Sequence, residues 1–237
     1  MRRWRSTACN DLITLTKFDA LLFDMDGLLL DSEREFMTSL VELGRPLGFS
    51  KDALEGFFRR IVGTSAAVTS DALAAFLPDH VDPAAFEKDW RATNARRRQG
   101  HIPLRPDVDL VIPSLAAAGY RMAVVTSTKR APALQHLDHA GLLEHFELLV
   151  GGDEVAANKP DPAPYLQAAR ALGVNPTSCA AFEDSDLGTQ AAVSAGCTTT
   201  QIPDLRPSVP LPQLGQRVAN SLGQAVRELG LLPMHVA

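Results

Sequence analysis

Five short apolar runs recur along the chain, and helix-like stretches separate them. Most of these runs are nearly continuous in apolar or small residues, which is typical of parallel strands that are covered on both faces. The alternation of strands and helices predicts an α/β fold built on an open, doubly wound parallel sheet. The predicted strands are FDALLFD (18–24), YRMAVVTS (120–127), FELLVGG (146–152), SCAAFED (178–184) and CTTTQIP (197–203).

Residues that start and stop helices lie between the later runs. In DPAPYLQAARALG, we expect Asp161 as the N-cap, Pro162 as the first helical residue and Gly173 just past the end. A further helix is expected from Ser185 to a stop at Gly196.

Prolines shape two other expectations. Pro113 lies inside the helix expected at 107–118, so that helix should be kinked or should start late. The segment 203–216 contains four prolines, and we expect it to be an irregular crossing before a last helix.

One region breaks the alternation of strands and helices. Helical patterns dominate between residues 32 and 103, at about 52–61, 66–77 and 83–99. The segment SERE (32–35) fits a capping box, which would open a helix that ends near Gly44 or Gly48.

These patterns predict a division of the chain. Residues 32–103 are expected to form an all-helical cap domain, inserted directly after the first strand. Residues 18–31 and 104–237 would form the α/β core, and residues 1–17 a loose N-terminal extension. Asp31–Ser32 and Pro103–Pro106 would be the hinges between core and insertion.

The composition narrows the class of protein. The chain has 237 residues, of which 46% are apolar and 22% charged, as in ordinary soluble globular proteins. Its net charge of −5 provides no basic footprint, so we expect no nucleic-acid partner. The arginine-rich run RATNARRRQG (91–100) is interpreted as a solvated helix face.

The cysteine spacing and the lengths of the apolar runs indicate the cellular compartment. Cys9, Cys179 and Cys197 stand apart without Cys-x-x-Cys spacing, which favours a reducing compartment and no zinc site. The basic start leads into no run of signal-peptide length, and no stretch approaches the roughly 20 apolar residues of a membrane span. We therefore expect a cytoplasmic protein with no membrane partner. The sequence leaves the oligomeric state open, with a monomer favoured.

Polar side chains follow four of the predicted strands at the points where these strands end. Ligands of doubly wound sheets bind beyond the carboxyl ends of the strands, so these side chains should meet there. They are Asp24 and Asp26 after the first strand, Thr126 and Ser127 after the second, Lys159 in NKPDP after the third, and Glu183 and Asp184 after the fourth.

This set of side chains suits phosphoryl transfer. Gathered carboxylates repel by ~4 kcal/mol per pair at 4 Å with an effective dielectric near 20, and a Mg²⁺ ion would relieve that repulsion. One carboxylate can attack phosphorus to give an aspartyl-phosphate. A second can protonate the leaving oxygen and later activate water, while lysine and hydroxyl donors hold the phosphoryl oxygens.

The segments DMDGLLLDSE, VVTST, NKPDP and FEDSDLG resemble, in order and spacing, the four motifs of the haloacid dehalogenase-like superfamily. The likeness is greatest to the branch that holds β-phosphoglucomutase and small-molecule phosphatases with a helical cap, and it spans residues 18–203. The resemblance implies that Asp24 is the nucleophile that becomes phosphorylated. It also implies that Asp26 is the general acid/base and ligates Mg²⁺ through its backbone carbonyl.

The resemblance assigns roles to the remaining motif residues as well. Thr126 would donate its hydroxyl to the phosphoryl group, with backbone contact from Ser127, and Lys159 would bridge the nucleophile and the phosphate. Glu183 and Asp184 would complete the metal site begun by Asp24 and Asp26. Gly27 would allow the turn after the two acids, and the cap would close over the site and exclude water.

Residue identity separates the activities within the superfamily. Dehalogenases lack the second aspartate, so Asp26 disfavours that activity, and neither Lys51 nor Lys88 is singled out as a phosphonatase lysine. β-Phosphoglucomutases carry a cap histidine where this chain has Phe36 and an arginine where it has Ala66. We therefore predict a Mg²⁺-dependent phosphomonoester hydrolase that acts on a small phosphorylated metabolite, and we expect a sugar phosphate. A hexose-phosphate mutase of the β-phosphoglucomutase type remains the alternative.

Substrate selection is expected to lie in the cap. Gly63, Thr64 and Ser65 match the family's cap loop that faces the catalytic centre, and we expect them to contact the substrate. Further candidates for anion contact are Lys51, Arg59 and Arg60, and Arg130 is a candidate for the pocket border. The six histidines fall at no motif and are interpreted as structural or exposed.

Overall fold

The structure is a computed structural model and describes residues 18–62, 64, 66–100, 102–205 and 211–233. Its centre is a parallel sheet of six strands in the order β3-β2-β1-β4-β5-β6. The strands are β1 (Ala20–Phe23), β2 (Met122–Val125), β3 (Leu148–Val150), β4 (Cys179–Glu183), β5 (Thr198–Gln201) and β6 (Arg217–Val218). The first five fall within the five predicted runs.

Helices cover both faces of this sheet, as the continuous apolar runs predict. In β1, Leu21 and Phe23 join one apolar cluster, while Ala20 and Leu22 join a second cluster on the opposite face. The first cluster contains residues of α5 (Val108–Ala117), α6 (Arg130–His139) and α9 (Leu222–Glu228). The second contains residues of α7 (Ala163–Leu172) and α8 (Asp186–Ser194). The doubly wound α/β class is therefore confirmed.

The helix boundaries follow the predicted caps closely. The expected start of α7 is wrong by one residue, because Pro162 is the N-cap and the helix begins at Ala163. The carboxylate of Asp161 still accepts a hydrogen bond from the Ala163 backbone N–H, and Gly173 ends the helix with φ +70°. Ser185 caps α8 through the Gly188 N–H, at 3.0 Å. The expected late start of α5 is wrong, because this helix begins at Val108 and runs through Pro113.

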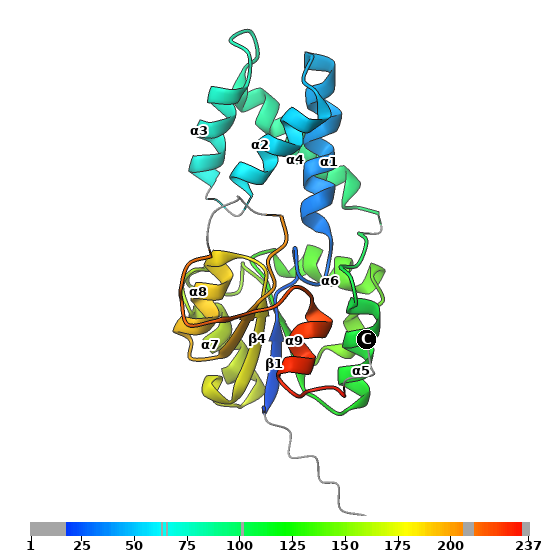
Figure 1. Cartoon of the computed structure of the whole chain (residues 1–237), viewed down its shortest axis with the longest axis vertical. Helices are drawn as coiled ribbons and strands as arrows, with labels where there is room; N and C mark the ends of the chain where they lie inside the picture. The colour runs from blue at the N-terminus through cyan, green and yellow to red at the C-terminus, as the bar shows by residue number, and fades with distance from the viewer. Residues whose placement is uncertain (1–17, 63, 65, 101, 206–210, 234–237) are drawn as a thin grey trace, which may run out of the picture.

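Between β1 and α5, the described residues form four α-helices: α1 (Ser32–Gly44), α2 (Lys51–Ile61), α3 (Ala66–Phe76) and α4 (Pro83–Arg97). Figure 1 shows them above the sheet, at the carboxyl ends of its strands. They pack around their own apolar cluster, which includes Phe57, Phe58 and the fully buried Trp90. Single 3-10 turns occur at Arg45–Leu47, Leu143–His145 and Pro176–Ser178.

The predicted capping box at the start of α1 is wrong. Asp31 is the N-cap residue and makes no side-chain cap bond. The Glu35 carboxylate accepts instead from Arg97 of α4, at 2.9 Å. An ion pair between two helices has therefore replaced the local contact.

The two segments that connect the four-helix insertion to the sheet are paired with each other. Leu30 and Leu104 form an antiparallel bridge. The Asp31 N–H donates to Pro103 O at 2.8 Å, and the Arg105 N–H donates to Leu29 O at 3.0 Å. Beside this pair, Arg105 and Arg34 both bind the Asp204 carboxylate, at 2.8 and 3.1 Å.

None of the helices among the described residues has both the length and the apolar character that crossing a membrane requires.

Candidate active site

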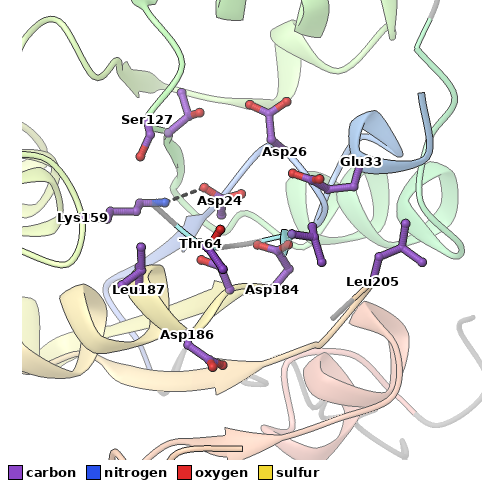
Figure 2. A pocket seen from close by; sticks show the side chains of 13 residues that line it. Asp24, Asp26, Glu33, Thr64, Ser127, Lys159, Asp184, Asp186, Leu187 and Leu205 are labelled. Atoms are coloured by element: carbon purple, nitrogen blue, oxygen red, sulfur yellow. Dashed lines mark hydrogen bonds and ion pairs between the residues drawn. The ribbon is translucent and has the colours of Figure 1, made fainter. Parts of the chain in front are cut away.

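A cavity of about 330 Å³ lies where the carboxyl ends of the strands meet the insertion (Figure 2). The predicted residues that line it are Asp24, Asp26, Thr64, Thr126, Ser127, Lys159 and Asp184. These side chains come from four strand ends and from the insertion. Gly63 and Ser65, which were also predicted, lie outside the described residues.

Lys159 holds Asp24 in a fixed orientation. Its ammonium group donates to Asp24 Oδ1 at 2.5 Å, to Glu183 Oε1 at 2.6 Å and to Val125 O at 2.8 Å. Burial alone would lower the pKa of Lys159, but the two carboxylates outweigh burial and raise it. Lys159 therefore stays charged, and all three of its hydrogens are directed at acceptors.

Glu183 lies beneath the cavity and does not line it. It is fully buried, and its Oε1 also accepts a hydrogen bond from Tyr165 Oη at 2.5 Å. Gly188 packs directly on this carboxylate, since a Cβ at position 188 would lie 2.1 Å from it. Glu183 thus anchors Lys159 from below, and Oε2, which among the described residues accepts one long hydrogen bond, from Ser185 Oγ at 3.4 Å, is the oxygen that it could offer to a metal.

Three carboxylates converge next to the cavity. Ligand oxygens of Asp24, Glu183 and Asp184 lie within 4.8 Å of one another. Burial and then the charge of Asp24 raise the pKa of Asp184 well above its ordinary value. A cation would relieve this repulsion, and a donor set made only of carboxylate oxygens fits Mg²⁺.

Gly27 lets the turn after Asp26 approach this cluster. Its φ is +85°, and a Cβ at this position would lie 2.2 Å from Asp184 Oδ2. The predicted need for glycine at the turn is therefore confirmed, and close approach to Asp184 is a second reason for it.

Both carboxylate oxygens of Asp26 are engaged. Arg98 donates to Oδ1 at 2.5 Å, and Thr128 Oγ1 donates to Oδ2 at 2.6 Å. Burial by itself would raise the pKa of Asp26, but the charge of Arg98 and the bond from Thr128 outweigh it and lower the pKa. In this arrangement Asp26 is held as a carboxylate.

Sequence reasoning missed Arg98. It follows the last residue of α4 and lies in the run interpreted as a solvated face, yet its side chain is only 20% exposed and reaches Asp26, 72 positions earlier. The interpretation of 91–100 is therefore wrong for Arg98. Thr128 was also missed, although its position two residues after Thr126 was a usable signal.

Thr126 directly follows β2 and is almost fully buried. Its N–H donates to Val150 O at 3.0 Å, and its Oγ1 accepts from the Thr128 N–H at 3.0 Å. Ser127 is exposed at the cavity, so the two residues present one fixed and one accessible hydroxyl.

The insertion contributes Glu33, Val62 and Thr64 to the cavity wall. Burial, and then the nearby charge of Asp26, raises the pKa of Glu33 to about 7. Thr64 donates its hydroxyl to Ile61 O at 2.6 Å. Glu33 was not predicted as a site residue.

The other basic candidates lie outside this cavity. Lys51 and Arg59 both pair with Glu55 on the surface of α2, at 3.5 and 3.3 Å. Arg130 pairs with Glu154 at 3.1 Å, and the guanidinium of Arg60 lies 5.7 Å from the centre of the Phe57 ring.

Phe36, where a mutase would carry a histidine, stacks on Trp90 with ring centres 4.2 Å apart. None of the histidines that the structure describes lines the cavity. His136 lies near it, however, with Nδ1 3.4 Å from Arg98.

Comparisons with known proteins agree with this geometry. A family model described as haloacid dehalogenase-like hydrolase matches residues 21–202. A phosphorylated carbohydrates phosphatase of Thermotoga maritima is 31% identical over 178 residues, which cover 75% of this chain and 82% of that protein. A fructose-1-phosphate phosphatase of Escherichia coli is 30% identical over 190 residues, which cover 78% of this chain and 97% of that protein. A solved HAD family hydrolase of Deinococcus radiodurans, with bound phosphate and sodium, has a TM-score of 0.75 and 30% identity, and covers 92% of this chain and 98% of its own.

Proposed function

Since the chain belongs to the haloacid dehalogenase-like hydrolases and is a phosphatase of phosphorylated metabolites, we propose that it hydrolyses phosphomonoesters in a Mg²⁺-dependent reaction through a phosphorylated Asp24. The observation that carries this proposal is the position of Asp24. Its carboxylate faces the cavity, and one oxygen is held by the buried Lys159.

In the first step, an oxygen of Asp24 attacks phosphorus and the bond between phosphorus and the ester oxygen breaks. Asp26, once it has left Arg98 and taken up a proton, protonates the leaving oxygen. In the second step, Asp26 takes a proton from water, which attacks the phosphoryl group and releases inorganic phosphate and Asp24. Thr126 and the backbone at Ser127 would bind the phosphoryl oxygens, and the positive charge of Lys159 would offset the charge that develops there in the transition state.

Asp24 and Asp184 would hold the Mg²⁺ ion, with the backbone carbonyl of Asp26 and with Glu183 Oε2. When bound, the ion supplies charge neutralisation between the acids and the phosphate dianion. The raised pKa of Asp184 and the convergence of three carboxylates support this assignment.

The insertion would act as a cap over this chemistry, and its bounds would be those expected from the sequence, 32–103. Glu33, Val62 and Thr64 reach the cavity from it. Asp26 has to leave Arg98 before it can donate a proton, so substrate binding and movement of Arg98 would be coupled.

We propose a sugar phosphate as the substrate. Two relatives carry phosphorylated-carbohydrate or fructose-1-phosphate phosphatase as their names, and Glu33 and Thr64 offer polar contacts for hydroxyl groups. Phe36 is packed on Trp90 and has no proton to exchange, which favours hydrolysis over the mutase reaction.

The test is inorganic phosphate release from a panel of sugar phosphates and other small phosphomonoesters, with Mg²⁺ and with a chelator. We expect release that chelation abolishes, and no release from the Asp24→Asn variant. Asp19→Asn makes the same chemical change at an exposed position before β1 and should retain full activity.

Full activity in Asp24→Asn would overturn the assignment of the nucleophile. Isomerised sugar phosphate without free phosphate, together with an acyl-phosphate on Asp24, would identify the enzyme as a mutase.

A further inference from the structure

A second cavity lies between the end of α4 and helix α6, and its lining includes Arg98 and Thr128, the two partners of Asp26. We call it the α4–α6 cleft. It has a volume of about 530 Å³. Its polar walls include Arg91, Arg98 and Gln99 from the insertion and Gln135, His136 and His139 from α6. Thr128, which donates to Asp26, also lines it, so the cleft borders the candidate acid/base.

Among the described residues, the lining of the cleft includes guanidinium, imidazole and amide groups and no carboxylate, although the chain as a whole has 28 acidic and 23 basic side chains. Glu87 partly compensates one of the arginines, since it pairs with Arg91 within α4 at 2.9 Å. Guanidinium, imidazole and amide groups that face one cavity form a surface suited to a small oxyanion.

Arg98 is the residue that connects the cleft with the active site. Its Nη2 donates to Asp26, while its Nε is buried and has no hydrogen-bond partner among the described residues. A guanidinium binds an oxyanion most strongly through two parallel N–H bonds. Arg98 makes only a single N–H bond to Asp26, through Nη2, so its Nε–H is left without an acceptor among the described residues.

We propose that the α4–α6 cleft binds a small tetrahedral oxyanion, such as inorganic phosphate, and that the bound anion competes with Asp26 for Arg98. Occupation of the cleft then frees Asp26 for proton transfer. That consequence rests on the proposed function, whereas the anion site and its competition with Asp26 do not.

The first experiment follows the histidine ring signals by NMR while sulfate is added at constant ionic strength to the full chain. We expect saturable shifts at His136 and His139, and none at His80 and His145, which lie outside the cleft. Single His→Gln variants assign the signals. If the rings of His136 and His139 respond no differently from the others, the anion site is excluded.

Matched variants locate the site. Gln135→Glu places a carboxylate in the cleft and should weaken sulfate binding at least about tenfold, since like charges in contact are strongly unfavourable. Gln190→Glu makes the same change at an exposed position of α8 and should bind as the wild type does. Arg98→Lys keeps the charge, loses the planar fork and should also weaken binding. Unchanged binding in both Gln135→Glu and Arg98→Lys would overturn the assignment.

The competition has its own readout, which needs no turnover. Asp26→Asn removes the partner that holds Arg98, so sulfate should bind at least about fivefold more tightly, as linkage requires when two ligands share one group. Asp19→Asn is the control for the same change elsewhere. Equal or weaker sulfate affinity in Asp26→Asn would overturn the competition, and a missing phosphatase activity would overturn only the proposed function.

Discussion

Gly27 combines two requirements in one residue. Its backbone adopts a positive φ of +85°, and the Asp184 side chain occupies the space where a Cβ would lie. Gly27→Ala should therefore displace Asp184 and weaken Mg²⁺ binding, in addition to a backbone cost of about 1–2 kcal/mol. Calorimetric titration with Mg²⁺ and thermal unfolding measure the two effects.

Gly119→Ala separates the two contributions. Gly119 has a nearly identical φ of +84°, and no atom lies within 4 Å of the Cβ that the change would add. It should lose similar stability and keep Mg²⁺ affinity. Equal Mg²⁺ affinity in both variants would contradict the role of Gly27 beside Asp184.

Candidate site residues at strand ends could be predicted from the sequence, whereas site residues brought in by tertiary contacts could not. Asp24, Asp26 and Lys159 follow predicted strands, so strand geometry alone brings them to one edge of the sheet. Arg98 lies at the end of α4, in the insertion, and binds Asp26, which is 72 positions earlier in the chain. No local pattern distinguishes it, because the helical sequence before an arginine looks the same whether its side chain forms a buried ion pair or lies in solvent.

At the scale of elements, α1 carries a titratable group into the cavity. Burial and Asp26 raise the pKa of Glu33 to about 7 from an ordinary value of 4.5. The folded state therefore retains a proton that the unfolded state loses, and the free energy of unfolding falls as pH rises from 4.5 to 7. Glu33→Gln removes this loss. Measured in chelator, the variant should match the wild type near pH 4.5 and exceed it by up to about 3 kcal/mol at pH 8.

Denaturant unfolding at the two pH values checks this expectation. Glu42→Gln makes the same change on the exposed side of α1 and should not exceed the wild type at pH 8. A Glu33→Gln variant that is equally stable or less stable at pH 8 would contradict the environment described for Glu33.

Elements with a strong local sequence pattern could be predicted, whereas elements whose structure depends on tertiary contacts could not. Apolar runs located β1 to β5, and Gly173 located the end of α7. β6 has only two residues, Arg217 and Val218, both exposed, so it lacks an apolar pattern and depends on pairing with β5. The capping box failed because Arg97 competes for Glu35 from another helix.

At the scale of the whole molecule, Asp204 ties the insertion to the sheet. It lies in the segment after β5, is 3% exposed and binds both Arg34 of α1 and Arg105 of the returning connection. Asp204→Asn should lower the free energy of unfolding by about 1–3 kcal/mol, because the partly buried Arg105 loses its nearer carboxylate and keeps only Asp31, at 3.9 Å. The backbone amides of Asp31 and Arg105 should then exchange hydrogen faster.

Glu147→Gln is the matched comparison. Glu147 pairs with Arg121 at 2.6 Å, but both side chains are about half exposed. Its loss should change stability by no more than about 0.5 kcal/mol and leave exchange at Asp31 and Arg105 unaltered. Equal effects of the two variants would show that Asp204 does not fasten the insertion.

The paired connections at 29–31 and 103–105 have a consequence for how such a molecule can diversify. The chain leaves the core and returns to it at adjacent, hydrogen-bonded positions. For the sheet, the insertion is therefore equivalent to a short hairpin loop, whatever its length. The entropy of closing the intervening loop grows only slowly with its length. A different helical unit grafted between these points would leave the strand ends with Asp24, Lys159 and Asp184 in place, while Asp26 would lose the Arg98 partner that the present unit supplies. The anchorage of the unit and its hold on Asp26 are thus separately replaceable.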